Sequence, residues 1–148
     1  MKYEVYTGIK VTDDFNVFDF ISTGKHGNIL KRVVFTKTEE DDVYNLALGD
    51  VDDDNDLNDY AVTDNGDRNK VLATVVSIIG AYTKRFPDRW IIFRGITAER
   101  TRLYRMAIGL NYKELSVTYE IWGLLSEEVV LFAKDPAINA FVIRRKNS

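Results

Sequence analysis

The sequence predicts an α+β fold, in which a mostly antiparallel β-sheet has two helices packed on one face. Short stretches of alternating or β-branched residues fill the first 50 positions, and the turns between them are too short for parallel crossovers. Two longer stretches farther along the chain carry apolar residues at helical spacing. Such helices are apolar on one side, so each must pack that side against a face of the sheet.

We expect three strands before residue 50. Residues 16–22 alternate apolar and polar side chains, residues 29–36 are rich in β-branched and aromatic types, and residues 43–48 alternate again. A glycine-bracketed hairpin turn separates the first two strands, and His26 is expected to be an exposed residue of this turn.

Residues 50–67 are predicted to form a long, solvated loop, because they include eight aspartates and few apolar residues. Residues 68–86 follow as a helix with an apolar stripe, and Pro87 ends it. Either Asn65 or Asp67 is expected to cap the start of this helix with its side-chain oxygen.

The aspartates of this loop have part of a calcium-binding pattern. Asp52, Asp54 and Asp56 have the spacing that begins an EF-hand loop. However, Leu57 stands where that loop needs glycine, and Thr63 stands where it needs a bidentate glutamate. We therefore assign no metal site, and a weak divalent-cation site stays open as the alternative to a solvated loop.

The second half is expected to continue with a strand, a helix and further strands. Residues 90–93 are an apolar run typical of a buried strand. Thr97 is expected to cap a helix over residues 98–112. The remaining elements are strands at 117–123 and 140–145, a strand or helix at 129–133, and a turn at Ile138 and Asn139. The predicted order is β-β-β-loop-α-β-α-β-(β)-β.

Length and composition limit the kinds of protein to which this chain can belong. The 148 residues are expected to form a single domain. The absence of cysteine excludes disulfides, thiolate metal ligands and a cysteine nucleophile, and the single histidine excludes a site built from several histidines. The sequence contains neither a visible signal peptide nor an apolar run of about 18 residues. We therefore expect a cytoplasmic protein that does not contact membranes and uses no cofactor.

Charge divides the chain between Asp67 and Arg68. Residues 1–67 contain 16 acidic and 6 basic residues, a net charge of −10, whereas residues 68–148 contain 7 acidic and 14 basic residues, a net charge of +7. Such asymmetry indicates either a face that meets a charged partner or attraction between two parts of one domain. The overall pI of about 5.2 does not favour nucleic-acid binding, although the basic half leaves a local contact open.

The strongest candidate for an anion site is the strand-to-helix turn at residues 95–102. Gly95 permits a tight turn, and the free N–H groups and dipole of the following helix favour an anion. Arg94, Arg100 and Arg102 add donors, although the last two diverge by about 200° on a helix. The alternative is that these arginines pair with carboxylates of the chain.

Several of these segments together resemble an uncharacterised family of bacterial proteins of similar length, a domain of unknown function. The resemblance covers nearly the whole chain and rests on residues 22–27 (STGKHG), 44–50 (YNLALGD), 65–74 (NGDRNKVLAT), 95–105 (GITAERTRLYR) and 140–146 (AFVIRRK). It implies no activity. It does imply that five charged residues belong to one shared pattern: Asp50, Asp67, Lys70, Arg100 and Arg102.

The leading hypothesis is a small binding or regulatory module of unknown partner and oligomeric state. Its contact surface is expected where Asp50 and Asp67 meet the arginine-bearing helix start. The alternative is a protein that binds a phosphate-bearing ligand or nucleic acid, or an enzyme on such a substrate. In that alternative the two aspartates hold a metal ion or act as base, while Lys70, Arg100 and Arg102 hold phosphate. No catalytic residue is assigned, and whether the chain is an enzyme stays open.

Overall fold

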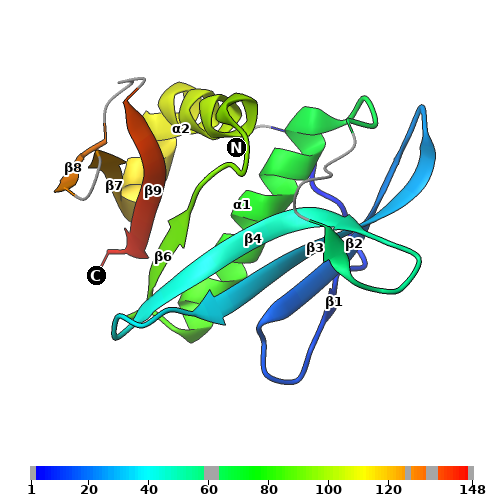
Figure 1. The fold of residues 1–148 in the computed structure, drawn as a ribbon, viewed down its shortest axis with the longest axis horizontal. Coiled ribbons are helices and arrows are strands. Elements are labelled where there is room, and N and C mark those ends of the chain that lie inside the picture. The colour runs from blue at the N-terminus through cyan, green and yellow to red at the C-terminus, as the bar shows by residue number, and fades with distance from the viewer. Residues whose placement is uncertain (1–2, 59–63, 126–127, 133–136, 147–148) are drawn as a thin grey trace. The chain divides into compact units, whose positions relative to one another are not determined.

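Nine strands and two helices make up the described part of the chain, and they form an α+β fold as predicted. The structure is a computed structural model that describes residues 3–58, 64–125, 128–132 and 137–146. The strands form a mixed, mostly antiparallel sheet (Figure 1). They are β1 (Lys10–Val11), β2 (Val17–Gly24), β3 (Gly27–Lys37), β4 (Val43–Val51), β5 (Leu57–Asn58), β6 (Trp90–Phe93), β7 (Tyr119–Leu125), β8 (Glu128–Leu131) and β9 (Ile138–Arg145). The helices are α1 (Arg68–Arg85) and α2 (Ala98–Thr118).

The chain divides into two compact units, and each unit is assembled from two separate stretches of sequence. Residues 1–36 and 46–82 form the first unit, and residues 37–45 and 83–148 form the second. The strand β4 contributes to both, because it begins in the second unit and ends in the first.

The first unit has an aromatic and aliphatic core between α1 and the β2–β3 hairpin. Phe18 and Phe20 on β2 are each 2% exposed, and Phe35 on β3 is 3% exposed. The Phe35 ring stacks on the ring of Tyr82 in α1, with centroids 3.7 Å apart. The buried side of α1 is the apolar stripe that the sequence predicted: Val71, Val75, Ile78, Ile79 and Tyr82.

The acidic segment was wrongly predicted to be one long loop. β4 pairs with β5 in an antiparallel hairpin across the first part of this segment. In the hairpin turn the Asp52 carboxylate accepts the N–H groups of Asp54 at 3.0 Å and Asp56 at 2.9 Å. Backbone pairing and such side-chain-to-backbone bonds need no apolar residues, so composition did not reveal them. The rest of the segment, residues 59–63, which includes Thr63, lies outside the described residues.

The second unit is a sheet against which α2 packs. β6, β9, β7 and β8 are hydrogen-bonded in that order, and residues 43–45 of β4 pair with β6 in parallel. The Tyr104 ring of α2 meets Phe93 of β6 edge-on, with centroids 5.7 Å apart. The helix extends beyond the predicted residues 98–112, because the exposed polar residues Lys113 and Glu114 interrupt the apolar pattern. Val117 and Thr118, which were predicted to begin a strand, are therefore helical, and β7 begins at Tyr119.

The C-terminal strands differ from the sequence prediction at one turn. Ile138 and Asn139 were predicted to form a turn, but they begin β9. Ile138 is 1% exposed and fills the space beside Gly123, where a Cβ atom would lie 2.8 Å from the isoleucine side chain. The ambiguous stretch 129–133 is the strand β8 up to Leu131, and Ala133 lies outside the described residues.

The burial of Tyr104 predicts a dependence of stability on alkaline pH. Burial raises the pKa of the Tyr104 phenol above its ordinary value of 10.0, and the nearby Arg100 charge partly opposes this shift. The unfolded chain therefore releases this proton first, and the stability that Tyr104 contributes below about pH 10 is lost as the pH rises toward the folded-state pKa. We expect Tyr104→Phe to lessen the fall in melting temperature between about pH 9 and about pH 11, measured by circular dichroism. Identical falls in both proteins would contradict this expectation.

Candidate binding site at the start of α1

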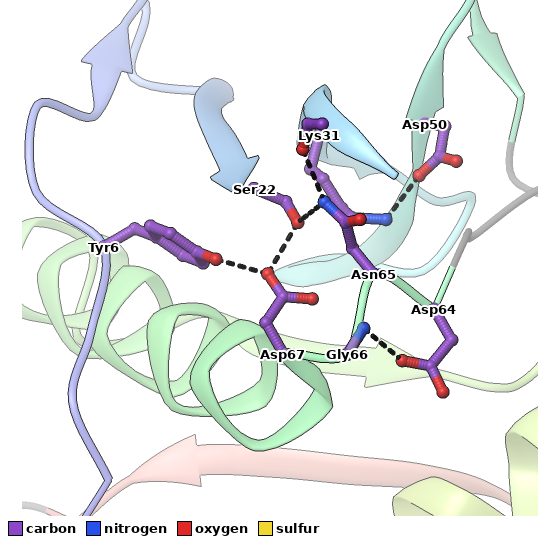
Figure 2. A network of polar contacts seen from close by, with 9 residues as sticks. Tyr6, Ser22, Lys31, Asp50, Asp64, Asn65, Gly66 and Asp67 are labelled. Carbon is purple, nitrogen blue, oxygen red and sulfur yellow. Dashed lines mark hydrogen bonds and ion pairs between the residues drawn. The ribbon is translucent and has the colours of Figure 1, made fainter. Parts of the chain in front are cut away.

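A network of hydrogen bonds holds the residue before α1. The Tyr6 hydroxyl donates to Oδ2 of Asp67, and the Ser22 hydroxyl donates to the same oxygen at 2.6 Å. The Tyr6 oxygen also accepts the N–H of Thr23 at 3.1 Å. Figure 2 shows both hydroxyl groups converging on one oxygen of Asp67, while its other oxygen points away from them. The carboxylate of Asp67 is therefore fixed in position by two side chains.

Asn65 ties the β2–β3 turn to the segment before α1. This residue is 1% exposed. Its amide nitrogen donates to the Gly27 carbonyl at 2.8 Å and to the Ser22 hydroxyl at 3.2 Å, and its amide oxygen accepts the N–H of His26 at 2.6 Å. Its backbone carbonyl accepts the N–H of Lys25 at 3.2 Å. Both polar ends of the side chain are thus used to position the turn.

These hydrogen bonds show that the predicted side-chain cap of α1 is wrong. Asn65 and Asp67 were the expected capping residues, but within the described part of the chain their side chains bind the turn, Tyr6 and Ser22. The backbone carbonyl of Asp67 does accept the N–H of Val71 at 2.9 Å, so the helix starts where predicted. The first turn of α1 is therefore left without a side-chain cap from either residue.

Gly24 lies against the backbone of Asn65, and this close approach can be tested. A Cβ atom at position 24 would lie 2.0 Å from the Asn65 carbonyl oxygen. We expect Gly24→Ala to lower the free energy of unfolding by about 3 kcal/mol in urea titrations, because the turn must move. Gly27→Ala is the control, since its φ of +82° adds strain of about 1 kcal/mol but no atom lies within 4 Å of the new Cβ. Equal losses in both variants would contradict the close approach.

Asp50 forms an ion pair with a buried lysine. The Nζ of Lys31 lies 2.6 Å from Oδ1 of Asp50, and the two side chains are 0% and 14% exposed. Figure 2 places this pair beside Asn65. A buried ammonium group is costly unless it is paired, so the Asp50 carboxylate offsets part of the cost of burying Lys31. Across the described residues, no group of three or more acidic or histidine side chains is arranged to hold a metal ion.

An open pocket of about 550 Å³ lies beside the first turn of α1. The Nζ of Lys70 lies 3.8 Å from the Glu4 carboxylate and 4.3 Å from the centre of the Tyr6 ring. No acidic residue occupies the first turn of the helix. The residues that line the pocket are Tyr3, Glu4, Asp64, Gly66, Asp67, Arg68, Asn69 and Lys70. Two of the predicted site residues, Asp67 and Lys70, thus line one pocket.

Four further predicted site residues, Arg94, Thr97, Arg100 and Arg102, belong to the second unit and lie around the start of α2. The Thr97 hydroxyl oxygen accepts the N–H of Arg100 at 3.2 Å, which confirms Thr97 as the cap. Arg94 and Arg102 are exposed, whereas Arg100 is half-buried. Glu99 lies in the first turn. The positive end of α2 is therefore partly compensated by its own cap and by an acidic side chain.

A comparison with known families decides to which group the chain belongs. The model of DUF6934, a family of unknown function, matches residues 2–146 of the 148-residue chain. The chain belongs to this family. Searches of curated proteins and of solved structures returned no match.

Membership of DUF6934 confirms the resemblance found in the sequence and supplies no activity, so a function has to be argued from geometry. Among the described residues, no helix is long and apolar enough to cross a membrane.

The sequence did not reveal the residues that hold Asp67. Tyr6 lies 61 positions away from Asp67 and Ser22 lies 45 positions away, so no local spacing relates them. The available signal was the Asn65-Gly66-Asp67 turn, where Gly66 has a φ of +81°. That turn predicted the start of α1 but not the partners of its side chains.

Proposed function

We propose that this member of DUF6934 is a binding module whose ligand site is the pocket at the start of α1. The observation that carries the proposal is that Asp67 is held by Tyr6 and Ser22 instead of capping the helix. The N–H groups of the first turn of this 18-residue helix therefore adjoin a pocket, on a turn without acidic residues. The start of α2, in contrast, has both the Thr97 cap and Glu99.

The pocket favours a small polar ligand that combines an anionic group with hydrogen-bond donors. The first-turn N–H groups with Arg68 and Lys70 suit a phosphate or carboxylate group. Glu4, Asp64 and Asp67 repel a bare dianion, but they accept hydrogen bonds from hydroxyl or amino groups. A sugar phosphate has both kinds of group and is the probe that this chemistry selects.

The proposal is tested by following the backbone amide signals in NMR spectra during titration. With a hexose phosphate added to about 10 mM, we expect saturable shifts at Gly66, Arg68, Asn69 and Lys70. Inorganic phosphate and the free hexose are expected to bind more weakly, because each offers only half of the matching chemistry. The double variant Arg68→Ala/Lys70→Ala is expected to raise the Kd by about tenfold.

The control for this experiment is Lys84→Ala, which removes an exposed cation from the last turn of the same helix and should leave the Kd unchanged. Absence of saturable shifts would contradict the proposal. Shifts confined to the start of α2 would instead support the second candidate, an anion site formed by Arg94, Thr97, Arg100 and Arg102. Turnover of the hexose phosphate would show an enzyme in place of a binding module.

We further propose that the chain acts as a single domain in the bacterial cytoplasm. The sharing of β4 by both compact units and the family match over residues 2–146 support a single domain. The sequence contains no cysteine, which is compatible with a reducing compartment.

A further inference from the structure

Tyr6 contacts two charged residues of the pocket at the start of α1, Asp67 and Lys70. Its hydroxyl group donates to Oδ2 of Asp67, and the centre of its ring lies 4.3 Å from the Nζ of Lys70. Tyr6 is 8% exposed, whereas Asp67 and Lys70 are half-buried and line the pocket. One buried side chain is thus in contact with two charged groups that can meet a ligand.

Further contacts hold Tyr6 itself in place. Its backbone N–H donates to the Thr74 hydroxyl oxygen at 2.9 Å, and that hydroxyl donates to the Lys70 carbonyl at 2.7 Å. The Tyr6 ring stacks on the ring of Phe20, with centroids 5.7 Å apart, and its hydroxyl oxygen accepts the N–H of Thr23 at 3.1 Å. Because its backbone, ring and oxygen are all held, Tyr6 can keep a carboxylate at a defined position.

The backbone of Asp67 occupies the capping position of α1. Its carbonyl accepts the N–H of Val71 at 2.9 Å, which is the bond that an N-cap residue makes. An aspartate at this position normally turns its carboxylate onto the N–H groups two or three residues later, here those of Asn69 and Lys70. Figure 2 shows its Oδ2 held by two hydroxyl groups instead. The carboxylate therefore has two alternative sets of partners.

We propose that Tyr6 and Ser22 are positioning residues of this ligand site, which act by keeping the Asp67 carboxylate away from the N–H groups of the first helical turn. The inference rests on the proposed function of the pocket. A carboxylate that capped α1 would occupy the N–H groups that an anionic ligand needs, and it would add a negative charge where the ligand binds. With the carboxylate held aside by the two hydroxyl groups, those N–H groups stay available to the ligand.

The first test needs no ligand. The double variant Tyr6→Phe/Ser22→Ala removes both hydroxyl groups but keeps the aromatic ring at position 6. We expect the Asp67 carboxylate to cap α1 in this variant. Capping moves the amide proton signals of Asn69 or Lys70 downfield in NMR spectra and slows their exchange with solvent by about tenfold. Tyr6→Phe alone should give a smaller change in the same direction. Unchanged amide signals in the double variant would overturn the proposal.

The second test measures the Kd for the hexose phosphate. We expect the double variant to raise this Kd by about tenfold, with an unchanged circular dichroism spectrum. Asp67→Ala removes the competing carboxylate and leaves the Tyr6 hydroxyl a second acceptor, the Thr23 carbonyl at 3.2 Å. On this background, loss of the two hydroxyl groups should not raise the Kd further. An equal rise on both backgrounds would show that the hydroxyl groups act on stability alone and would overturn the proposal.

Asp67→Ala by itself should bind within about tenfold of the unaltered protein, because Glu4 and Asp64 still accept hydrogen bonds from the ligand. Complete loss of binding in this variant would show that the carboxylate is the main ligand contact, which would also overturn the proposal. Tyr119→Phe is the matched control, since Tyr119 is a tyrosine of β7 with 7% exposure and belongs to the second unit. It should change neither the amide signals nor the Kd.

The two tests separate this inference from the proposed function. Capping signals without a change in Kd would show that the first-turn N–H groups do not bind the ligand, and the positioning role would fall. If the unaltered protein bound no hexose phosphate, the proposed function and the role of Tyr6 and Ser22 in binding would fall together. The ligand-free amide signals would then still show whether the two hydroxyl groups keep Asp67 from capping α1.

Discussion

Replacing Asp50 with alanine is expected to lower the free energy of unfolding by about 3–5 kcal/mol. The reason is that Lys31 is fully buried, and its Nζ lies 2.6 Å from the Asp50 carboxylate. Removing the carboxylate takes a counter-charge at 2.6 Å away from an ammonium group in the interior. Urea denaturation followed by far-UV circular dichroism measures the loss.

Replacing the other member of the ion pair, Lys31, should lower the free energy of unfolding by a smaller amount. Lys31→Met keeps most of the side-chain volume and removes the buried charge, while Asp50, at 14% exposure, keeps some contact with water. We expect a loss of less than about 2 kcal/mol. If Lys31→Met were as harmful as Asp50→Ala, the pair would stabilise the protein by mutual attraction and not by relief of a buried charge.

Truncation of Phe35 to alanine is expected to cost about 3–5 kcal/mol. This ring is 3% exposed, stacks on Tyr82 of α1 and meets Phe18 edge-on with centroids 5.8 Å apart. Its loss opens a cavity between the helix and the β2–β3 hairpin. Differential scanning calorimetry should show a lower melting temperature with little change in the circular dichroism spectrum at low temperature.

The neighbouring residue provides the control. Thr36 is exposed at the same strand, so Thr36→Ala should change stability by less than about 0.5 kcal/mol. A Phe35→Ala variant within about 1 kcal/mol of the unchanged protein would show that the core repacks around the missing ring.

The sequence predicted the helices and strands with strong apolar periodicity and missed those held by backbone pairing alone. The apolar stripe over residues 68–86 correctly predicted α1, and the apolar run at residues 90–93 correctly predicted β6. The two-residue strands β1 and β5 were not predicted, because their pairing uses N–H and C=O groups that every residue has. Ile138 was expected in a turn but lies in β9, where its side chain fills a gap beside Gly123. No local sequence pattern reveals this contact.

Only two of the charged residues that line the candidate site were predicted from the sequence. Asp67 and Lys70 were identified from the sequence, and both line the pocket at the start of α1. Tyr6 and Ser22 were not, because ordinary core-forming alternation gives no sign that a hydroxyl group will meet a carboxylate from a distant segment. The partner of Asp50, Lys31, was hidden for the same reason, since a lysine on a strand is normally expected to face water.

The sharing of β4 by both units limits how this protein can be divided into truncated fragments. No single cut separates the units, because residues 37–45 of the second unit lie within the sequence of the first. A fragment that starts at Thr83 would leave β6 without its parallel partner at residues 43–45 and would expose a new strand edge, which is a site of aggregation. Deletion mapping with N- and C-terminal fragments is therefore expected to yield insoluble material, and point substitutions on the full chain are the appropriate way to assign its surfaces.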